Sequence, residues 1–303
     1  MIADAPPGPI RRVAYLGTPA VAVPPLRALV AAGFEVPVVV TAPDKRRGRG
    51  SAAVPTPVAA VAHELGLAVA HDATALLDHD LDAGVVVAFG QILRPPVLGH
   101  VPLVNLHFSL LPRWRGAAPV ERAILAGDAE TGVCVMAVEE GLDTGDVYAS
   151  DRTPVGDKTL AELWDELAVR GSELLVEALG AGLAGPVPQR GEVTYAAKLE
   201  KADRFLDPTA EGAEQLARRV RLGGAWTAFR GARLGVVAAR PVELDGPSVA
   251  DGAAPGALLD GPVVVAADGR GLLLEVVRPE GRGDVAAADW VRGIRPAPDE
   301  RVG

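Results

Sequence analysis

The chain has 303 residues, 49% of them hydrophobic, and is therefore long enough for two domains that each bury a core. Its formal net charge of −9 argues against attraction of nucleic acid to the whole surface, and its one cysteine excludes a disulfide framework and a cysteine-based metal site. No apolar run reaches the roughly 20 residues that a membrane span needs. We expect a soluble cytoplasmic protein without a metal, with a loose tail over residues 1–10 that is not a secretory signal.

Short apolar segments alternate with helical patterns through the first two hundred residues. The patterns predict strands at residues 13–16, 36–40, 67–70, 85–89 and 131–138, and helices at 26–30, 58–65 and 121–125, with a further helix opened by a capping box at 159–162. The strand at 85–89 is apolar throughout, as in a parallel strand that is covered on both faces. This alternation predicts an α/β domain with a doubly wound, mostly parallel sheet, whose functional side chains lie at the carboxyl ends of the strands.

The chemically most distinctive segment is NLHFSLLPRWRGAAP, residues 105–119. The pattern predicts a strand over residues 101–110, which places Asn105, His107 and Ser109 on one face. Such a polar face suits a carbonyl group, because an Asn amide can donate to a developing oxyanion and a His can carry a proton. The structural alternative is a His and an Asn whose polar groups are satisfied inside a turn.

Two further segments follow predicted strands. Gln91 follows the apolar strand at 85–89, and the sequence EEGLDTGD occupies residues 139–146. These carboxylates fit a plain acidic turn, or a group that orders an imidazole, holds a water and accepts a proton. By chemistry alone, Asp143 and Asp146 are both candidates for that role.

A basic loop, PDKRRGRG, occupies residues 43–50 and contains four cations and one acid. Such clusters often form solvated loops, but Lys and Arg on a glycine-rich loop also suit contacts with nucleic-acid phosphates. The turn that begins at Gly17 lacks the G-x-G-x-x-G pattern, so we reject a dinucleotide site there.

The last hundred residues have a different character. A helix is predicted at residues 210–221, followed by short strands at 234–238, 263–266 and 272–277 that are separated by tight Gly turns, and this pattern predicts a small barrel. Residues 204–303 contain 13 arginines, no lysine and 14 acidic residues, a balance of −1. The last hundred residues are therefore much less acidic than the first two hundred, but they are not basic.

The upstream Asn and His, the SLLPRWRGAAP segment and the downstream GLDTGD together resemble the signature of the folate-dependent formyltransferase family. The likeness runs from about residue 12 to residue 200 and continues more weakly to the end, and it includes the turn GTP at 17–19 and the segment YAAKL at 195–199. It implies a formyltransferase-type, Rossmann-like catalytic domain over residues 11–203 and an OB-like barrel domain over 204–303.

The resemblance implies transfer of a formyl group from 10-formyltetrahydrofolate to the α-amine of methionine carried by initiator tRNA, an acceptor that rests on the basic loop, the RWRGAAP version of the motif and the C-terminal domain together. It assigns catalysis to Asn105, His107 and Asp143, with Asp143 preferred to Asp146. It also implies a folate site and a tRNA-binding loop in a monomeric enzyme. The folate site would comprise Gln91, Ser109, Leu110, Leu111 and Pro112, and the tRNA loop Lys45, Arg46, Arg47 and Arg49.

Two alternatives stay open. One is an N-formyltransferase that acts on an amino-sugar nucleotide, in which the basic loop would hold a diphosphate. The other is a folate-binding regulator with an inert site, which the intact set of Asn105, His107 and Asp143 disfavours. The C-terminal region departs from the tRNA-acting branch of the family, because LGGAW at residues 222–226 replaces a proline-rich patch and a lysine-bearing tail is missing.

Overall fold

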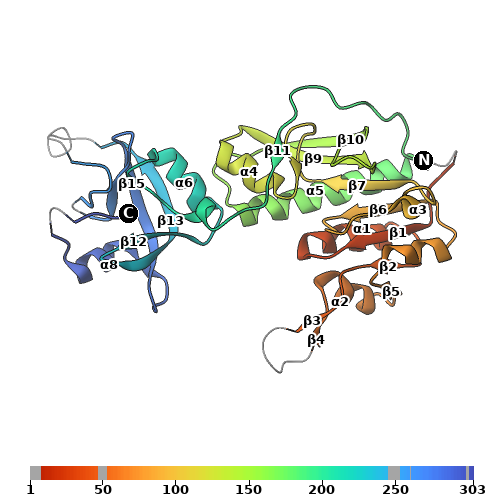
Figure 1. The fold of residues 1–303 in the computed structure, drawn as a ribbon, viewed down its shortest axis with the longest axis horizontal. Coiled ribbons are helices and arrows are strands. Elements are labelled where there is room, and N and C mark those ends of the chain that lie inside the picture. The colour runs from red at the N-terminus through yellow and green to blue at the C-terminus, as the bar shows by residue number, and fades with distance from the viewer. Residues whose placement is uncertain (1–7, 47–52, 245–252, 260, 298–299) are drawn as a thin grey trace. The chain divides into compact units, whose positions relative to one another are not determined.

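A computed structural model describes residues 8–46, 53–244, 253–259, 261–297 and 300–303 (Figure 1). The chain divides into two compact units. The first contains residues 1–120, 130–154 and 162–197, and the second contains residues 121–129, 155–161 and 198–303. None of the helices in the described part of the chain is both long and apolar enough to cross a membrane. The boundary at residues 203 and 204 and the loose tail stay predictions.

The first unit is built on a seven-stranded sheet in the order β10-β9-β7-β6-β1-β2-β5 (Figure 1). Strands β5, β2, β1, β6 and β7 run parallel, whereas β9 and β10 are antiparallel to their neighbours. The doubly wound, mostly parallel sheet is thus confirmed, and β10 is an addition that the sequence did not predict. The bounds are β1 Val13–Gly17, β2 Val39–Val40, β5 Val69–Ala70, β6 Ala83–Val87, β7 Leu103–His107, β9 Glu130–Ala137 and β10 Val147–Pro154.

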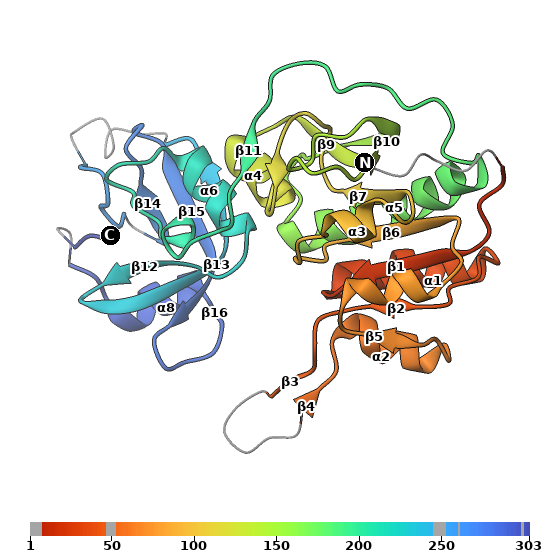
Figure 2. The same ribbon diagram turned by 45° about the vertical axis from the view of Figure 1, so that its right-hand side comes forward.

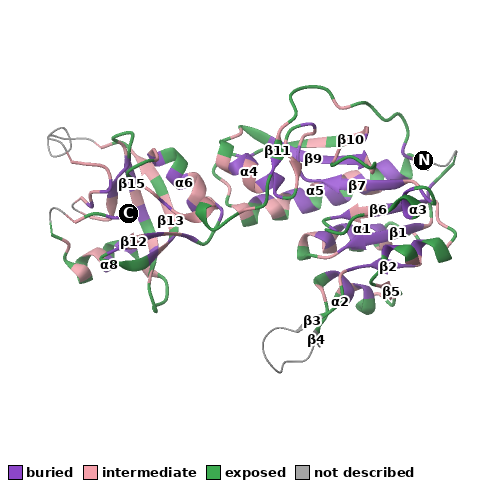
Figure 3. Ribbon diagram, viewed as in Figure 1, coloured by how far each residue is buried: buried purple, intermediate pink, exposed green. Residues whose placement is uncertain are grey.

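Helix α5, Leu160–Gly180, covers one face of β7. A Cβ added at Gly171 would lie 3.0 Å from Leu106 Cδ2, and the rings of Phe108 and Trp164 meet edge to face at 4.8 Å. Burial follows the central strands and one side of α5 (Figure 3). The remaining helices are α1 Val23–Ala31, α2 Pro57–Glu64, α3 Pro95–Leu98 and α4 Pro119–Ala126, with 3-10 turns η1 Ala20–Ala22 and η2 Ala73–Asp78.

A short antiparallel ladder joins the start of the basic loop to residues that follow it in the chain. Strand β3, Lys45–Arg46, pairs with β4, Ala53–Val54, where the sequence predicted only a loop. The predicted tRNA contacts Arg47 and Arg49 lie outside the described residues.

The second unit is organised around an antiparallel sheet in the order β12-β13-β15-β14, with β16 paired to β15. Helix α6 packs against β13, and α8 lies beside β15 and β16 (Figure 2). This arrangement is consistent with the predicted small barrel-like domain, but β12, β16 and α8 were not predicted. The bounds are β12 Ala225–Phe229, β13 Ala232–Val242, β14 Val263–Val265, β15 Gly271–Pro279, β16 Val285–Ala286, α6 Ala213–Arg221 and α8 Ala287–Ile294.

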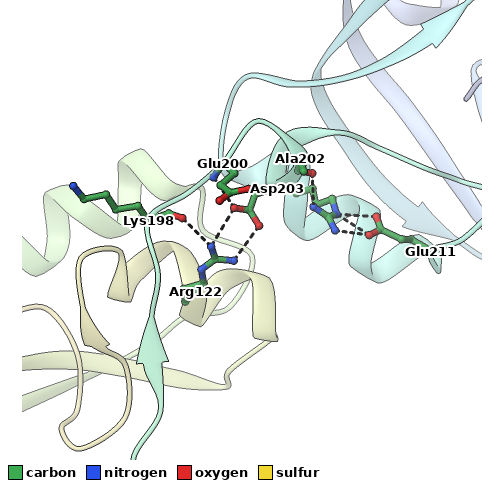
Figure 4. A network of polar contacts seen from close by, with 7 residues as sticks. Arg122, Lys198, Glu200, Ala202, Asp203 and Glu211 are labelled. Carbon is green, nitrogen blue, oxygen red and sulfur yellow. Dashed lines mark hydrogen bonds and ion pairs between the residues drawn. The ribbon is translucent and has the colours of Figure 1, made fainter.

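Side chains of α4 and α6 fix residues 198–204, which end in the 3-10 turn η3, Ala202–Arg204. Arg122 forms a two-pronged ion pair with Asp203 at 3.0 and 3.1 Å and also donates to the Lys198 carbonyl at 3.1 Å (Figure 4). Arg219 pairs with Glu211 and donates to the Ala202 carbonyl at 3.1 Å (Figure 4).

Burial raises the pKa of Asp203, but the Glu200 amide and the Arg122 guanidinium outweigh it and leave that pKa below its ordinary value of 3.8. The carboxylate form is therefore favoured by folding. The resulting stability is complete above the ordinary pKa of an aspartate and is lost as the pH falls through the lowered folded value.

Asp203→Asn should lower the free energy of unfolding by about 1–3 kcal/mol at pH 7, because hydrogen bonds to a charged group are lost. The difference from wild type should shrink as the pH falls below about 4. Urea denaturation at a series of pH values measures it. A difference that does not change with pH contradicts the assignment.

In the first unit, Leu167→Ala should lower the free energy of unfolding by about 2–5 kcal/mol, because it opens a cavity in the core. Leu167 is fully buried on α5, whereas Val169 on the same helix is 56% exposed. The control Val169→Ala should change stability by no more than about 0.5 kcal/mol. Equal losses for the two variants in urea denaturation would show that α5 does not pack as described.

Candidate active site

Asn105 and His107 are alternate residues of β7, the strand between β6 and β9. Asn105 lies opposite Val86 of β6 and Met136 of β9, so both neighbours hold the backbone in register. Because side chains alternate along a strand, Leu106 points to α5 and the two polar side chains point to the other face. His107 is only 5% exposed, which gives the imidazole a fixed and largely water-free position.

Asp143 completes a cluster with these two residues. Its Oδ1 lies 3.5 Å from the Asn105 Nδ2, and its Oδ2 lies 3.7 Å from the His107 Nδ1. The carboxylate also accepts a 2.8 Å hydrogen bond from the Gly116 amide and is 15% exposed. The structure thus brings the three predicted catalytic residues together. For the competing candidate Asp146, the backbone carbonyl accepts from the Ala137 amide at 2.9 Å and so continues the pairing of β9 with β10.

The acidic loop, residues 138–146, reaches this cluster from an unexpected side. Because β9 is antiparallel to β7, its last residue Ala137 lies opposite Val104, near the amino end of β7. The loop folds back so tightly that a Cβ at Gly145 would lie 2.1 Å from the Ala137 carbonyl oxygen. His107 thus lies at the carboxyl end of β7, where the rule for parallel strands places functional side chains, whereas the loop that carries Asp143 starts near the amino end of β7.

The hydrogen bond to Trp114 determines how His107 can act. Its Nε2 lies 2.9 Å from the Trp114 carbonyl oxygen. A carbonyl has no hydrogen to donate, so Nε2 must carry one, and Nδ1 is the nitrogen that can gain or lose a proton. That nitrogen faces Asp143, which gives a short path for a proton between imidazole and carboxylate.

Gly116 is required by its conformation and by its neighbour. It has φ of 118°, in the region that favours glycine, and a Cβ there would lie 2.9 Å from the Ala196 carbonyl oxygen. This close approach belongs to a short parallel ladder between β8, Arg115–Gly116, and β11, Tyr195–Ala196. The ladder directs the Gly116 amide at Asp143.

The SLLP turn differs from its prediction. Strand β7 ends at His107, so the expected strand over residues 101–110 was too long and Ser109 does not continue the polar face. Ser109 is fully buried, and its hydroxyl donates to the Arg113 carbonyl at 2.6 Å and so closes the turn. Pro112 is also buried, whereas Leu110 and Leu111 are half-buried. The assignment of this turn to folate stays a prediction.

Gln91 is exposed and follows the carboxyl end of β6, the parallel neighbour of β7. Next to it Ile92 is 91% exposed, and on the acidic loop Leu142 is 61% exposed. Two large apolar side chains are thus open to solvent, one beyond the carboxyl end of β6 and one next to Asp143 on the acidic loop. Their exposure was not predictable from the sequence, since apolar residues near strand ends are normally taken as core.

Residues that hold the site loops were also missed. Gln189 and Arg115 bond to each other, and Thr194 accepts a 2.9 Å hydrogen bond from the Trp114 amide. Such supports show no motif of their own, because their partners lie 74 to 80 residues away. Among the described residues, no group of three His, Cys, Asp or Glu side chains could hold a metal ion.

Comparison with known proteins agrees with this geometry. The family model described as formyl transferase matches residues 11–179, and the model of the formyl transferase C-terminal domain matches residues 198–295. The chain belongs to the formyl transferase family.

Individual relatives indicate which kind of formyl transferase the chain is similar to. The chain is 44% identical over 301 residues to the methionyl-tRNA formyltransferase of Rhizorhabdus wittichii, which covers 93% of this chain and 95% of that protein. It is also 44% identical over 315 residues to the methionyl-tRNA formyltransferase of Paenarthrobacter aurescens, with 96% and 99% covered.

Solved structures share the fold at much lower identity. An N-formyltransferase from Helicobacter canadensis, in complex with folinic acid and dTDP-3-aminofucose, has a TM-score of 0.68 at 14% identity, with 88% of this chain and 99% of that chain covered. HypX from Aquifex aeolicus, in complex with tetrahydrofolic acid, has a TM-score of 0.60 at 19% identity, with 94% and 47% covered. These likenesses show the fold alone.

Gly116→Ala should lower the rate of formyl transfer about 10-fold or more, because losing a hydrogen bond to a charged group costs about 1.5–3 kcal/mol. The added methyl group would push the amide away from Asp143. Gly66→Ala is the matched control: Gly66 has a φ of 69°, but a Cβ there meets nothing within 4 Å. If both variants lose equal activity, backbone strain alone explains the effect.

Proposed function

We propose that this chain transfers the formyl group of 10-formyltetrahydrofolate to the α-amine of methionyl initiator tRNA, giving formylmethionyl-tRNA in the cytoplasm. One observation carries the proposal: near full-length identity of 44% to methionyl-tRNA formyltransferases, in a chain that brings Asn105, His107 and Asp143 together. We further propose that the enzyme acts as a monomer.

The roles of the three residues follow from their chemistry. The amine nitrogen forms a bond to the formyl carbon, and the bond from that carbon to the folate nitrogen breaks. Asn105 donates its Nδ2 hydrogens to the formyl oxygen, which gains negative charge during attack. One proton must leave the amine and one must reach the folate nitrogen, so no net proton is released. His107 Nδ1 and the Asp143 carboxylate, 3.7 Å apart, accept and return this proton.

The surroundings of the cluster fit a folate. The pterin is a flat ring system with polar edges, and such ligands are held by apolar side chains with a few placed polar groups. Ile92 and Leu142 offer exposed apolar surface, and Gln91 offers an exposed amide on the neighbouring strand end. Leu110 and Leu111, half-buried beyond β7, would extend the apolar wall.

The acceptor would be bound by the basic loop. Lys45 and Arg46 lie on β3, so the start of the loop is held by pairing with β4. A charged loop anchored in this way suits phosphate contacts, which position a nucleic acid without reading its sequence. Arg47 and Arg49 would add to this charge.

Transfer of a labelled formyl group to methionyl initiator tRNA tests the proposal directly, with uncharged tRNA and a thymidine-linked amino sugar as competing acceptors. We expect labelling of the charged tRNA only. Asn105→Ala should lower kcat by about 10²–10³, because an oxyanion donor is lost, without lowering thermal stability. Transfer to the amino sugar instead of the tRNA would overturn the acceptor, and full activity of Asn105→Ala would overturn the mechanism.

A further inference from the structure

Residues 187–196 form one segment, called here the 187–196 segment. It contacts two loops of the candidate site: the acidic loop and the turn that contains Trp114 and Arg115. Near its start, Val187 exchanges two backbone hydrogen bonds of 2.9 Å with Val147, the first residue of β10, directly after the acidic loop. Near its end, Thr194 accepts from the Trp114 amide at 2.9 Å, and β11 pairs with β8. The segment is thus attached to both loops, with Gln189 between the attachments.

Gln189 uses its whole amide to join those loops. Its Nε2 donates to the Asp143 carbonyl at 2.9 Å and to the Gly145 carbonyl at 2.8 Å. Its Oε1 accepts from the Arg115 Nε at 3.1 Å and Nη2 at 2.6 Å. The orientation of the amide is unambiguous, since backbone carbonyls only accept and a guanidinium only donates. An isosteric carboxylate would lose both donors.

These contacts close a ring around Asp143. The Asp143 side chain accepts from the Gly116 amide, Gly116 is bonded covalently to Arg115, and Arg115 donates to Gln189. Gln189 returns to the Asp143 carbonyl. Asp143 is therefore fixed at its backbone and at its carboxylate by one connected set of groups.

The hydrogen bonds of Gln189 act on a turn with an uncommon backbone conformation. The φ of Asp143 is 49°, in the left-handed region, which is uncommon for residues other than glycine although Asn and Asp adopt it more readily than the rest. The hydrogen bonds to the carbonyls of Asp143 and Gly145 clamp both ends of this turn. A small rotation of the turn would move the carboxylate away from His107 and Asn105, and misplacing a reacting group by about 1 Å can cost roughly 100-fold in rate.

We propose that Gln189 is a positioning residue for formyl transfer: through the Asp143–Gly145 turn and Arg115, it sets the Asp143 carboxylate against His107 and Asn105. This inference rests on the proposed function of that cluster. Gln189 acts through Asp143 and not on the substrates, so its loss slows the reaction at saturation and leaves substrate binding intact.

Gln189→Met, Arg115→Met and the double variant test the proposal in steady-state formyl transfer to methionyl-tRNA. Each single variant should lower kcat about 10- to 100-fold and change the KM values for 10-formyltetrahydrofolate and tRNA less than about threefold. The double variant should lose little more than the worse single variant, because both residues hold the same turn. Glu192→Met is the matched control, since Glu192 is an exposed residue of the same segment and of similar size.

Each result is decisive. Unchanged kcat in Gln189→Met, a raised KM without a fall in kcat, or additive losses in the double variant would overturn the proposal. If the melting temperature of Gln189→Met lies far below that of the wild type, the isosteric variant Gln189→Glu distinguishes a positioning role from a role in stability. A folded, slow Gln189→Glu supports positioning, and a second unfolded variant shows a role in stability alone. A wild type that does not formylate methionyl-tRNA would refute the proposed function, whereas an active wild type with an active Gln189→Met refutes only this inference.

Discussion

The position of the Asp143 carboxylate is the constraint on which the rest of the site depends. A carboxylate that is largely removed from water needs hydrogen-bond donors around it, because an unpaired buried polar group costs free energy. Here the Gly116 amide lies at 2.8 Å, and the Asn105 amide and the His107 ring follow at 3.5 and 3.7 Å. The two side-chain distances are longer than good hydrogen bonds, so neither Asn105 nor His107 is fully engaged by Asp143 before a substrate arrives.

The sheet provides half of this geometry and the loops provide the other half. Strand β7 lies between a parallel and an antiparallel neighbour, so its backbone cannot shift without breaking two ladders. Its alternation directs Leu106 to α5 and the two polar side chains to the opposite face. The carboxylate, by contrast, comes from a loop that folds back over the sheet. In the proposed mechanism, a rigid strand therefore presents Asn105 to the formyl oxygen and His107 to the proton, and a braced loop presents the carboxylate that shares that proton with His107.

Much of the fold could be predicted, because its central strands are apolar and its helices keep their period. The elements that could not be predicted from the sequence are those without an apolar run. Strand β10 lies at the edge of the sheet, is half-buried over residues 147–149 and has exposed residues at 150, 152 and 154. It contains Asp151 and Arg152, so its composition is that of a loop. The candidate catalytic residues were assigned through a family motif, and the periodicity of the strand added only that Asn105 and His107 share a face. Ser109 was misplaced because the chain turns directly after His107, where the alternation of the strand no longer applies.

The choice of a neutral amide at position 189 also has an electrostatic reason. A lysine or arginine there would also donate to the carbonyls of Asp143 and Gly145, but would place a positive charge beside the carboxylate and compete with Asn105 and His107 for it. A glutamine supplies the same donors without a charge. Its Oε1 moreover binds the guanidinium of Arg115, the residue before Gly116, so this cation is directed at an amide oxygen. The carboxylate is thus held in place by groups that leave its charge available to the imidazole.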